Sequence, residues 1–129
     1  MTTDATIDTG EVPITGAIVE RVAEGVDPDP ATIVDALLTL NPELLGRHAE
    51  FERLGDYVTV DGTRAYRVGR SEWDDLLDGF EFDPSLAAAV RLAHTEQARN
   101  HFTTTVGADD RFATDEVGVV IGIDTAEQF

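Results

Sequence analysis

The order of apolar and polar residues predicts a β-hairpin near the middle of the chain. The stretch YVTVDGTRAYRVGR places two runs rich in Val, Tyr and Thr, 57–60 and 64–68, on either side of Asp61-Gly62. Such a dipeptide tolerates the positive φ angles of a tight turn, and β-branched and aromatic residues favour strands. We therefore expect an antiparallel hairpin over 57–68.

Capping signals predict where the helices begin. Asp29-Pro30, Asn41-Pro42 and Asp83-Pro84 each place a side-chain acceptor at the N-cap and a proline at the first helical position, where its missing N–H costs nothing. Thr15 and Ser71 are the expected caps of two further helices. The predicted helices cover 16–24, 30–40, 42–54, a short stretch from Ser71, and 84–105.

A last apolar run completes the predicted fold. VGVVIGI, residues 117–123, is continuously apolar and rich in β-branched residues, so we expect it to add a third strand to the hairpin. The expected fold class is α+β, with four to five helices and a small antiparallel sheet. Residues 1–12 are polar and are expected to form a flexible N-terminus before a single domain over 13–129.

The acidic, Lys-free composition of the chain affects how its net charge is interpreted. The chain has 129 residues, 26 acidic residues against nine basic ones, and a net charge of −17. All the basic residues are Arg, and there is no Cys. This profile resembles cytosolic proteins of salt-in halophilic archaea, and the order of segments is similar to small uncharacterised proteins of these organisms. The resemblance implies a habitat, and no activity. At molar salt distant charges are screened, so acidity indicates solubility more than partner choice.

The sequence also limits location and chemistry. No apolar run approaches the length of a membrane span, and the N-terminus has no basic and apolar leader, so we expect a cytoplasmic protein that does not bind membranes. Without Cys there is no disulfide, thiolate zinc site or Cys nucleophile. The acid pairs, such as Asp109-Asp110, lack the spacing of a calcium loop and are expected to be solvated surface. We expect no metal and no cofactor.

The histidines do not form an obvious catalytic set. His94 and His101 are seven residues apart on one predicted helix, a rise of about 10.5 Å, which is too far for both to bind one ion. His48 lies on an apolar stripe and is expected to be a hydrogen-bonded histidine at the edge of the core. No catalytic residue is predicted, although a small hydrolase using His48 or His94 is a third functional class to consider.

The least acidic part of the chain is the expected partner surface. From Arg47 to Arg70 there are five Arg against four acids. Arg64, Arg67, Arg70 and Arg47 are the predicted partner-binding residues, because Arg makes bidentate contacts to carboxylate or phosphate that resist salt. The alternative is that these arginines pair with acids of the same surface. If they are exposed, changing Arg64 and Arg67 together to Gln should leave folding nearly unchanged and abolish partner binding.

These observations favour a non-enzymatic intracellular interaction module that binds another protein. The main alternative comes from the order of three short helices and a hairpin over 14–70, which resembles winged-helix DNA-binding domains. That resemblance implies a transcriptional regulator with helix 42–54 in the major groove and Arg64 and Arg67 at phosphates. The Ala-rich helix 84–105 can pack closely either within the fold or against a second copy, so a homodimer through it is a further alternative.

Overall fold

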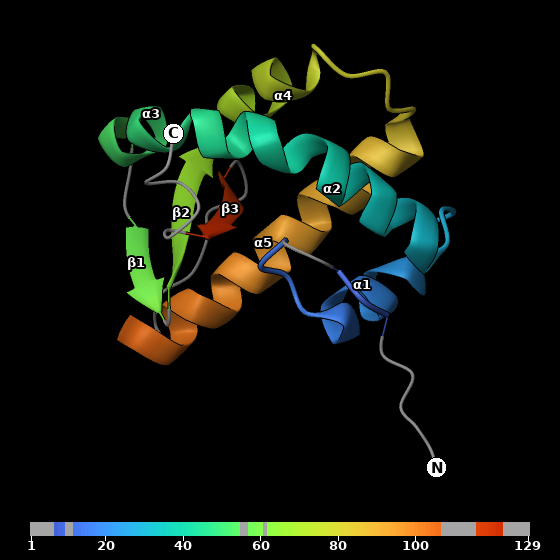
Figure 1. Cartoon of the computed structure of the whole chain (residues 1–129), viewed down its shortest axis with the longest axis horizontal. Helices are drawn as coiled ribbons and strands as arrows, with labels where there is room; N and C mark the ends of the chain where they lie inside the picture. Colours follow the sequence, from blue (N-terminus) through green and yellow to red (C-terminus); the bar gives the residue numbers. More distant parts are fainter. Residues whose placement is uncertain (1–6, 10–11, 55–56, 61, 107–115, 123–129) are drawn as a thin grey trace.

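The fold consists of five helices and one three-stranded sheet among the described residues of a computed structural model (Figure 1). Residues 7–9, 12–54, 57–60, 62–106 and 116–122 are described. The helices are α1 (Gly16–Ala23), α2 (Pro30–Gly46), α3 (His48–Leu54), α4 (Arg70–Leu77) and α5 (Pro84–Val106). The strands are β1 (Tyr57–Val60), β2 (Thr63–Gly69) and β3 (Glu116–Gly122). The predicted α+β class is confirmed.

The sheet has the strand order β1-β2-β3, and both pairs are antiparallel. Val60 pairs with Thr63 across the predicted turn, where Gly62 has a φ of 78°. A positive φ of this size costs glycine little, because it has no Cβ. Tyr66 pairs with both Tyr57 and Val119, in the centre of the sheet. The predicted hairpin and third strand are therefore confirmed.

Helices cover the sheet from more than one side. The long helix α5 packs against all three strands and, with its other sides, against α1 and α2 (Figure 1). The shorter helices α3 and α4 pack against β2. Ala89, Ala93 and Ala98 of α5 are fully buried, and such small side chains let neighbouring elements approach the helix closely. The Ala-rich stripe of this helix is therefore part of the intramolecular core.

Side chains of α5 close the outer edge of the sheet at β3. The backbone N–H of Gly118 donates to Thr95 Oγ1 at 3.0 Å, and that of Val120 donates to His94 Nδ1 at 3.2 Å. An uncovered strand edge is a template for pairing with another chain, and covering it with a helix removes that risk. His94 and Thr95 therefore satisfy backbone groups that β2 cannot reach.

Three of the predicted helix caps are present. Thr15 Oγ1 accepts from the N–H of Ile18 at 3.3 Å, at the start of α1. Asp29 Oδ1 accepts from Thr32 N–H, and Asp83 Oδ1 accepts from Leu86 N–H, both at 2.9 Å. Pro30 and Pro84 are the first helical residues behind these two aspartates. At these positions the capping residue and the proline in the sequence were sufficient to predict the start of the helix.

The predicted helix start at Asn41-Pro42 is wrong. Helix α2 continues through Pro42 to Gly46, and Asn41 is buried inside it. A proline in a helix loses one hydrogen bond, to the carbonyl four residues earlier, here that of Leu38. Leu38 is among the exposed residues of α2, so water can reach its side of the helix. Burial of the neighbouring Leu40, Leu44 and Leu45 outweighs the lost bond.

The predicted cap at Ser71 is also wrong, by two positions. Strand β2 runs to Gly69, which is itself the N-cap of α4 and makes no side-chain capping bond. Ser71 is thus the second residue of the helix. The expected burial of Trp73 and Leu76 against the core is confirmed.

The packed domain begins earlier than expected. The N–H of Ile7 donates to the Glu20 carboxylate at 2.9 Å, and Val12 and Ile14 are buried in the core. Ile7 and Val12, which we assigned to a flexible end, therefore contact the rest of the fold, and the flexibility expected for 1–12 as a whole stays a prediction. The predicted loop after Gly107 lies outside the described residues. Among the described helices, none combines the length and apolarity that crossing a membrane requires.

Candidate functional site

Arg64 lies in a network of contacts within the protein. Its guanidinium forms an ion pair with Glu52 of α3, donates to Thr59 Oγ1 at 3.2 Å, and lies 4.6 Å from the centre of the Tyr57 ring. Its side chain is 22% exposed. Burial alone would lower the pKa of Arg64, but a hydrogen bond with Tyr66 and the charge of Glu52 raise it. The hydrogen-bonding groups of this arginine are therefore largely used inside the protein.

Tyr66 belongs to the same network. It is buried, and its ring lies 5.5 Å from that of Phe51 and 5.6 Å from that of Tyr57, measured between centroids. Burial raises the pKa of Tyr66 to about 12, although the hydrogen bond and charge of Arg64 act in the opposite direction. The phenol is thus a neutral, packed group.

Arg67 makes different contacts on the opposite face of the sheet. Its guanidinium lies 3.9 Å from the Glu116 carboxylate of β3 and 5.6 Å from the centre of the Phe102 ring on α5. Its side chain is 20% exposed. Residues three apart in a strand point to opposite faces, so Arg64 and Arg67 do not share a surface. The expectation of one exposed surface containing both is wrong.

Arg70 stands apart from both of these arginines. It is exposed and is the first residue of α4. Burial and the neighbouring charge of Arg70 lower the pKa of Arg91 on α5, and the charge of Asp74 opposes this shift. Arg70 therefore lies near a second cation. Its role as a partner contact stays a prediction.

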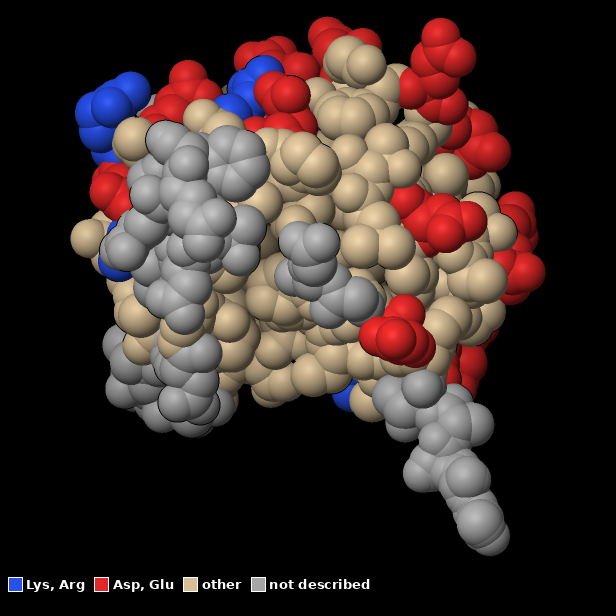
Figure 2. All heavy atoms as spheres, in the orientation of Figure 1, with Lys and Arg blue, Asp and Glu red and all other residues tan. Residues whose placement is uncertain are grey.

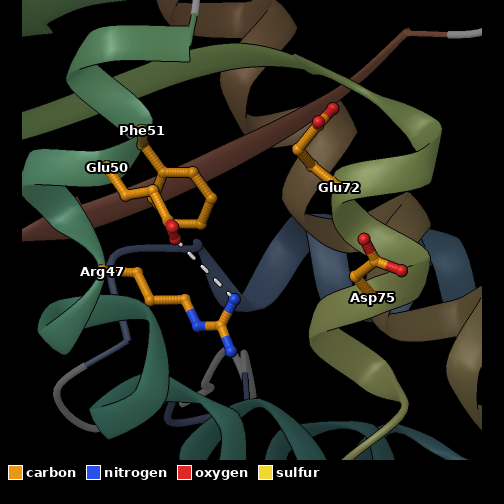
Figure 3. A pocket seen from close by; sticks show the side chains of 5 residues that line it. All are labelled: Arg47, Glu50, Phe51, Glu72 and Asp75. Carbon is orange, nitrogen blue, oxygen red and sulfur yellow. Dashed lines mark ion pairs between the residues drawn. The ribbon is translucent and has the colours of Figure 1, made fainter.

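Arg47, the fourth predicted residue, lines a cleft between α3 and α4, which we call the α3–α4 cleft. The cleft has a volume of about 200 Å³ and is lined by Arg47, Glu50, Phe51, Glu72 and Asp75. Figure 3 shows Arg47, Glu50 and Phe51 on one side and the two acids of α4 on the other. Its walls are thus supplied by α3 and α4, which the hairpin separates in sequence, together with Arg47 at the end of α2.

Acidic side chains outnumber basic ones in the lining of the α3–α4 cleft. Arg47 Nε lies 2.7 Å from the Glu43 carboxylate, and its Nη1 lies 3.8 Å from that of Glu50. The side chain of Arg47 is 37% exposed, compared with 22% for Arg64 and 20% for Arg67. Three carboxylates and one guanidinium line the cleft, and Phe51 is buried at its apolar side. The arrangement can receive a cationic side chain whose stem contacts an aromatic ring.

The histidines are in separate places. His94 is fully buried, its ring centroid lies 5.4 Å from that of Trp73, and burial lowers its pKa to about 3. His101 Nε2 lies 3.2 Å from Gln97 Nε2. His48 is the first residue of α3, and its side chain lies outside the described part of the structure. A buried imidazole cannot meet a substrate, so a catalytic role for His94 has no geometric support.

No group of three or more His, Asp or Glu that could hold a metal ion occurs among the described residues. Figure 2 shows acidic side chains along the upper and right-hand margins of one face, and the basic ones at the upper left lie beside acidic ones. Acidic surface is therefore widespread. What distinguishes the α3–α4 cleft is its concave shape and its apolar wall.

Sequence reasoning missed the acids of the α3–α4 cleft. Glu72 and Asp75 are three residues apart on α4, so they lie on one helix face, and that spacing is visible in the sequence. Their position opposite Arg47 depends on how α3 and α4 pack on β2, which no local pattern specifies. Buried His94 was missed because its acceptor role requires β3 to lie beside α5.

Comparisons with known proteins identify a family and no described function. No curated protein and no solved structure matches the chain. One family model matches residues 12–123, and its description is "Domain of unknown function (DUF8048)". The match covers all of the helices and strands described above. The chain therefore belongs to the DUF8048 family.

Proposed function

We propose that this protein is a non-enzymatic interaction module that binds a basic side chain of a partner protein in the α3–α4 cleft. The observation that carries this proposal is the lining of the cleft, where Glu50, Glu72 and Asp75 surround a concave site with a buried phenylalanine. Arg47 pairs with Glu43 and also contacts Glu50 at 3.8 Å, so Glu72 and Asp75 on the opposite wall supply the negative charge that is available to a cation.

A guanidinium is the partner group that fits best. It forms bidentate hydrogen bonds to carboxylates and stacks on aromatic rings, whereas an ammonium acts as a compact point charge. Such short-range contacts persist when diffuse attraction is screened. This matters because the acidic, Lys-free composition supports a cytoplasmic protein of a salt-in halophile, where the Debye length is about 3 Å.

DNA binding receives less support. The recognition helix expected over 42–54 is divided between the end of α2 and the short α3. The two arginines expected to reach phosphates lie on opposite faces of β2, and each has an acidic neighbour within the protein. A dimer through α5 likewise receives less support, since the small residues of that helix are buried in the core.

The test is a titration with a short peptide that carries two arginines, followed by NMR at 0.2 M and 2 M KCl. We expect backbone signals of α3 and α4 to shift, and the double variant Glu72→Gln/Asp75→Asn to bind at least about tenfold more weakly, a difference of about 1.4 kcal/mol. The same peptide with glutamines in place of the arginines should not bind.

A matched control removes the same charge elsewhere. Glu24 and Asp27 are exposed residues before α2, whose 17 residues separate them from Arg47 by about 25 Å. Glu24→Gln/Asp27→Asn should bind like the wild type. If both double variants lose binding equally, general acidity attracts the peptide and the cleft is not the site. Selective binding of duplex DNA at 2 M KCl would favour the regulator instead.

A further inference from the structure

The two outer edges of the sheet lie in different surroundings. At β3 the N–H groups of Gly118 and Val120 donate to side chains of α5, so this edge is covered. At the other edge β1 is the last of the described strands, and Figure 1 shows it at the left-hand margin of the molecule. Tyr57 and Thr59 of β1 are both exposed. The open edge of the described sheet is therefore that of β1.

The strand register shows which backbone groups β1 presents at this edge. In an antiparallel ladder the N–H and C=O groups of successive residues point alternately to one neighbouring strand and away from it. Because the N–H of Val120 points away from β2, its partner Ala65 directs its backbone groups to β1, where Ala65 pairs with Val58. Tyr57 and Thr59, on either side of Val58, therefore direct their N–H and C=O groups outward.

These outward backbone groups of Tyr57 and Thr59 have no hydrogen-bond partner within the described part of the chain. An unpaired strand edge is a template for pairing with another chain, and many proteins block it with charged side chains or proline. The sequence of β1, YVTV, contains neither a charged residue nor a proline. Its outer backbone can therefore receive another strand.

The strand that fits this edge is β1 of a second copy of the chain. If two copies of β1 run antiparallel about a two-fold axis at Val58, Tyr57 of each copy lies opposite Thr59 of the other. Each of these two pairs exchanges two hydrogen bonds, so every outward group of both residues is satisfied. Each aromatic side chain then lies opposite a β-branched one, a combination that stabilises sheets, and no like charges lie opposite each other. The edge of β1 is thus complementary to itself.

We propose that two copies of this chain associate through β1, so that their two sheets join into one. The assembly closes at two copies, because α5 covers the β3 edge and a symmetric interface uses the same surface of both subunits. The strand is short and each chain has a net charge of −17, so the association is weak and requires molar salt to screen the repulsion. No residue of β1 lines the α3–α4 cleft, so the dimer surface and the cleft are separate.

Sedimentation equilibrium of the full chain in 2 M KCl, at protein concentrations up to about 1 mM, tests the association. We expect a monomer–dimer equilibrium that weakens at 0.2 M KCl. NMR locates the interface: the amides of Tyr57 and Thr59 should shift and exchange more slowly as the concentration rises, whereas that of Val58, paired with β2, should be protected at every concentration. A chain that stays monomeric, or concentration-dependent shifts confined to other elements, would overturn the proposal. Shifts of these two amides only with the arginine peptide would assign the edge to a partner protein instead.

A matched pair of variants then tests the edge itself. Thr59→Pro removes the outward N–H and no hydrogen bond of the β1–β2 pair, and proline is tolerated on edge strands, so dimerisation should weaken at least about tenfold. Thr59→Val is the control, because both variants lose the hydroxyl that accepts from Arg64 Nε but only valine keeps the N–H. It should dimerise like the wild type. Equal dimerisation by the two variants would contradict the proposal, and if Thr59→Pro does not fold, the NMR series on the wild type decides alone.

Discussion

The surroundings of β2 and the α3–α4 cleft both combine arginine, acidic and aromatic side chains, but the arginines of β2 are covered by these groups whereas the cleft is open to a partner. Arg64 and Arg67 are mostly covered, and each has an acid and an aromatic ring of the same chain nearby. Arg47 is more exposed and lies in a concave site with more acids than it can neutralise. Positive charge in an acidic chain therefore does not by itself indicate a partner surface. Whether an arginine is free to contact a partner depends on which helices and strands pack around it.

The largest effect we predict concerns His94, in the covered region. Its pKa is about 3 in the folded state, because burial disfavours the charged form, against about 6.5 in an unfolded chain. The unfolded state binds the extra proton between these values, so folding stability is lost as the pH falls from 6.5 towards 3. Linkage gives a loss of about 3 kcal/mol by pH 4.5, as an order of magnitude.

The measurement compares chemical unfolding of the wild type and His94→Asn at pH 7 and pH 4.5 in molar KCl. Asparagine retains an acceptor in the position of Nδ1 for the Val120 N–H but does not titrate. The carboxylates titrate in both proteins, so the difference isolates His94. An equal loss of stability in the two proteins would show that this histidine is accessible to protons in the folded state.

Arg64→Gln should give the next largest effect. It leaves Glu52 without its cation and removes the hydrogen bond with Tyr66. Exposed pairs contribute about 0–1 kcal/mol and breaking buried ones costs about 3–5 kcal/mol, so we expect a loss of about 1–3 kcal/mol at this partly covered site. Chemical unfolding followed by circular dichroism measures it. A loss below about 0.5 kcal/mol would show that the contacts of Arg64 contribute little to stability and that its guanidinium is free to bind a partner.

Arg67→Gln should have a smaller effect. The distance to Glu116 is 3.9 Å, at the limit of an ion pair, and the contact with Phe102 is at 5.6 Å. We expect a loss of unfolding free energy of about 0.5–1.5 kcal/mol. Because Arg64 and Arg67 lie on opposite faces, the double variant should lose about the sum of the two single changes. A clear departure from additivity would indicate that the two arginines act in one network.

The fold could be predicted where the signal is local. Asp29 and Asp83 each bond to the third residue of their own helix, and Asp61-Gly62 lies between two strands in sequence. The same reasoning failed at Asn41-Pro42, since the burial of Leu40 and Leu44 depends on distant elements. The opposite orientation of Arg64 and Arg67 was predictable from the two-residue period of a strand. The α3–α4 cleft was not, because its two walls meet only through packing on β2.

The contrast between the two regions is tested most directly by measuring stability and peptide affinity in the same two variants at 2 M KCl. Arg64→Gln should lose stability and bind the arginine peptide like the wild type. Glu72→Gln/Asp75→Asn should unfold close to the denaturant concentration of the wild type, since surface charges contribute little, and should lose at least about tenfold in affinity. The opposite pattern, with affinity lost in Arg64→Gln and retained in the cleft variant, would contradict the account and place the partner surface on the hairpin.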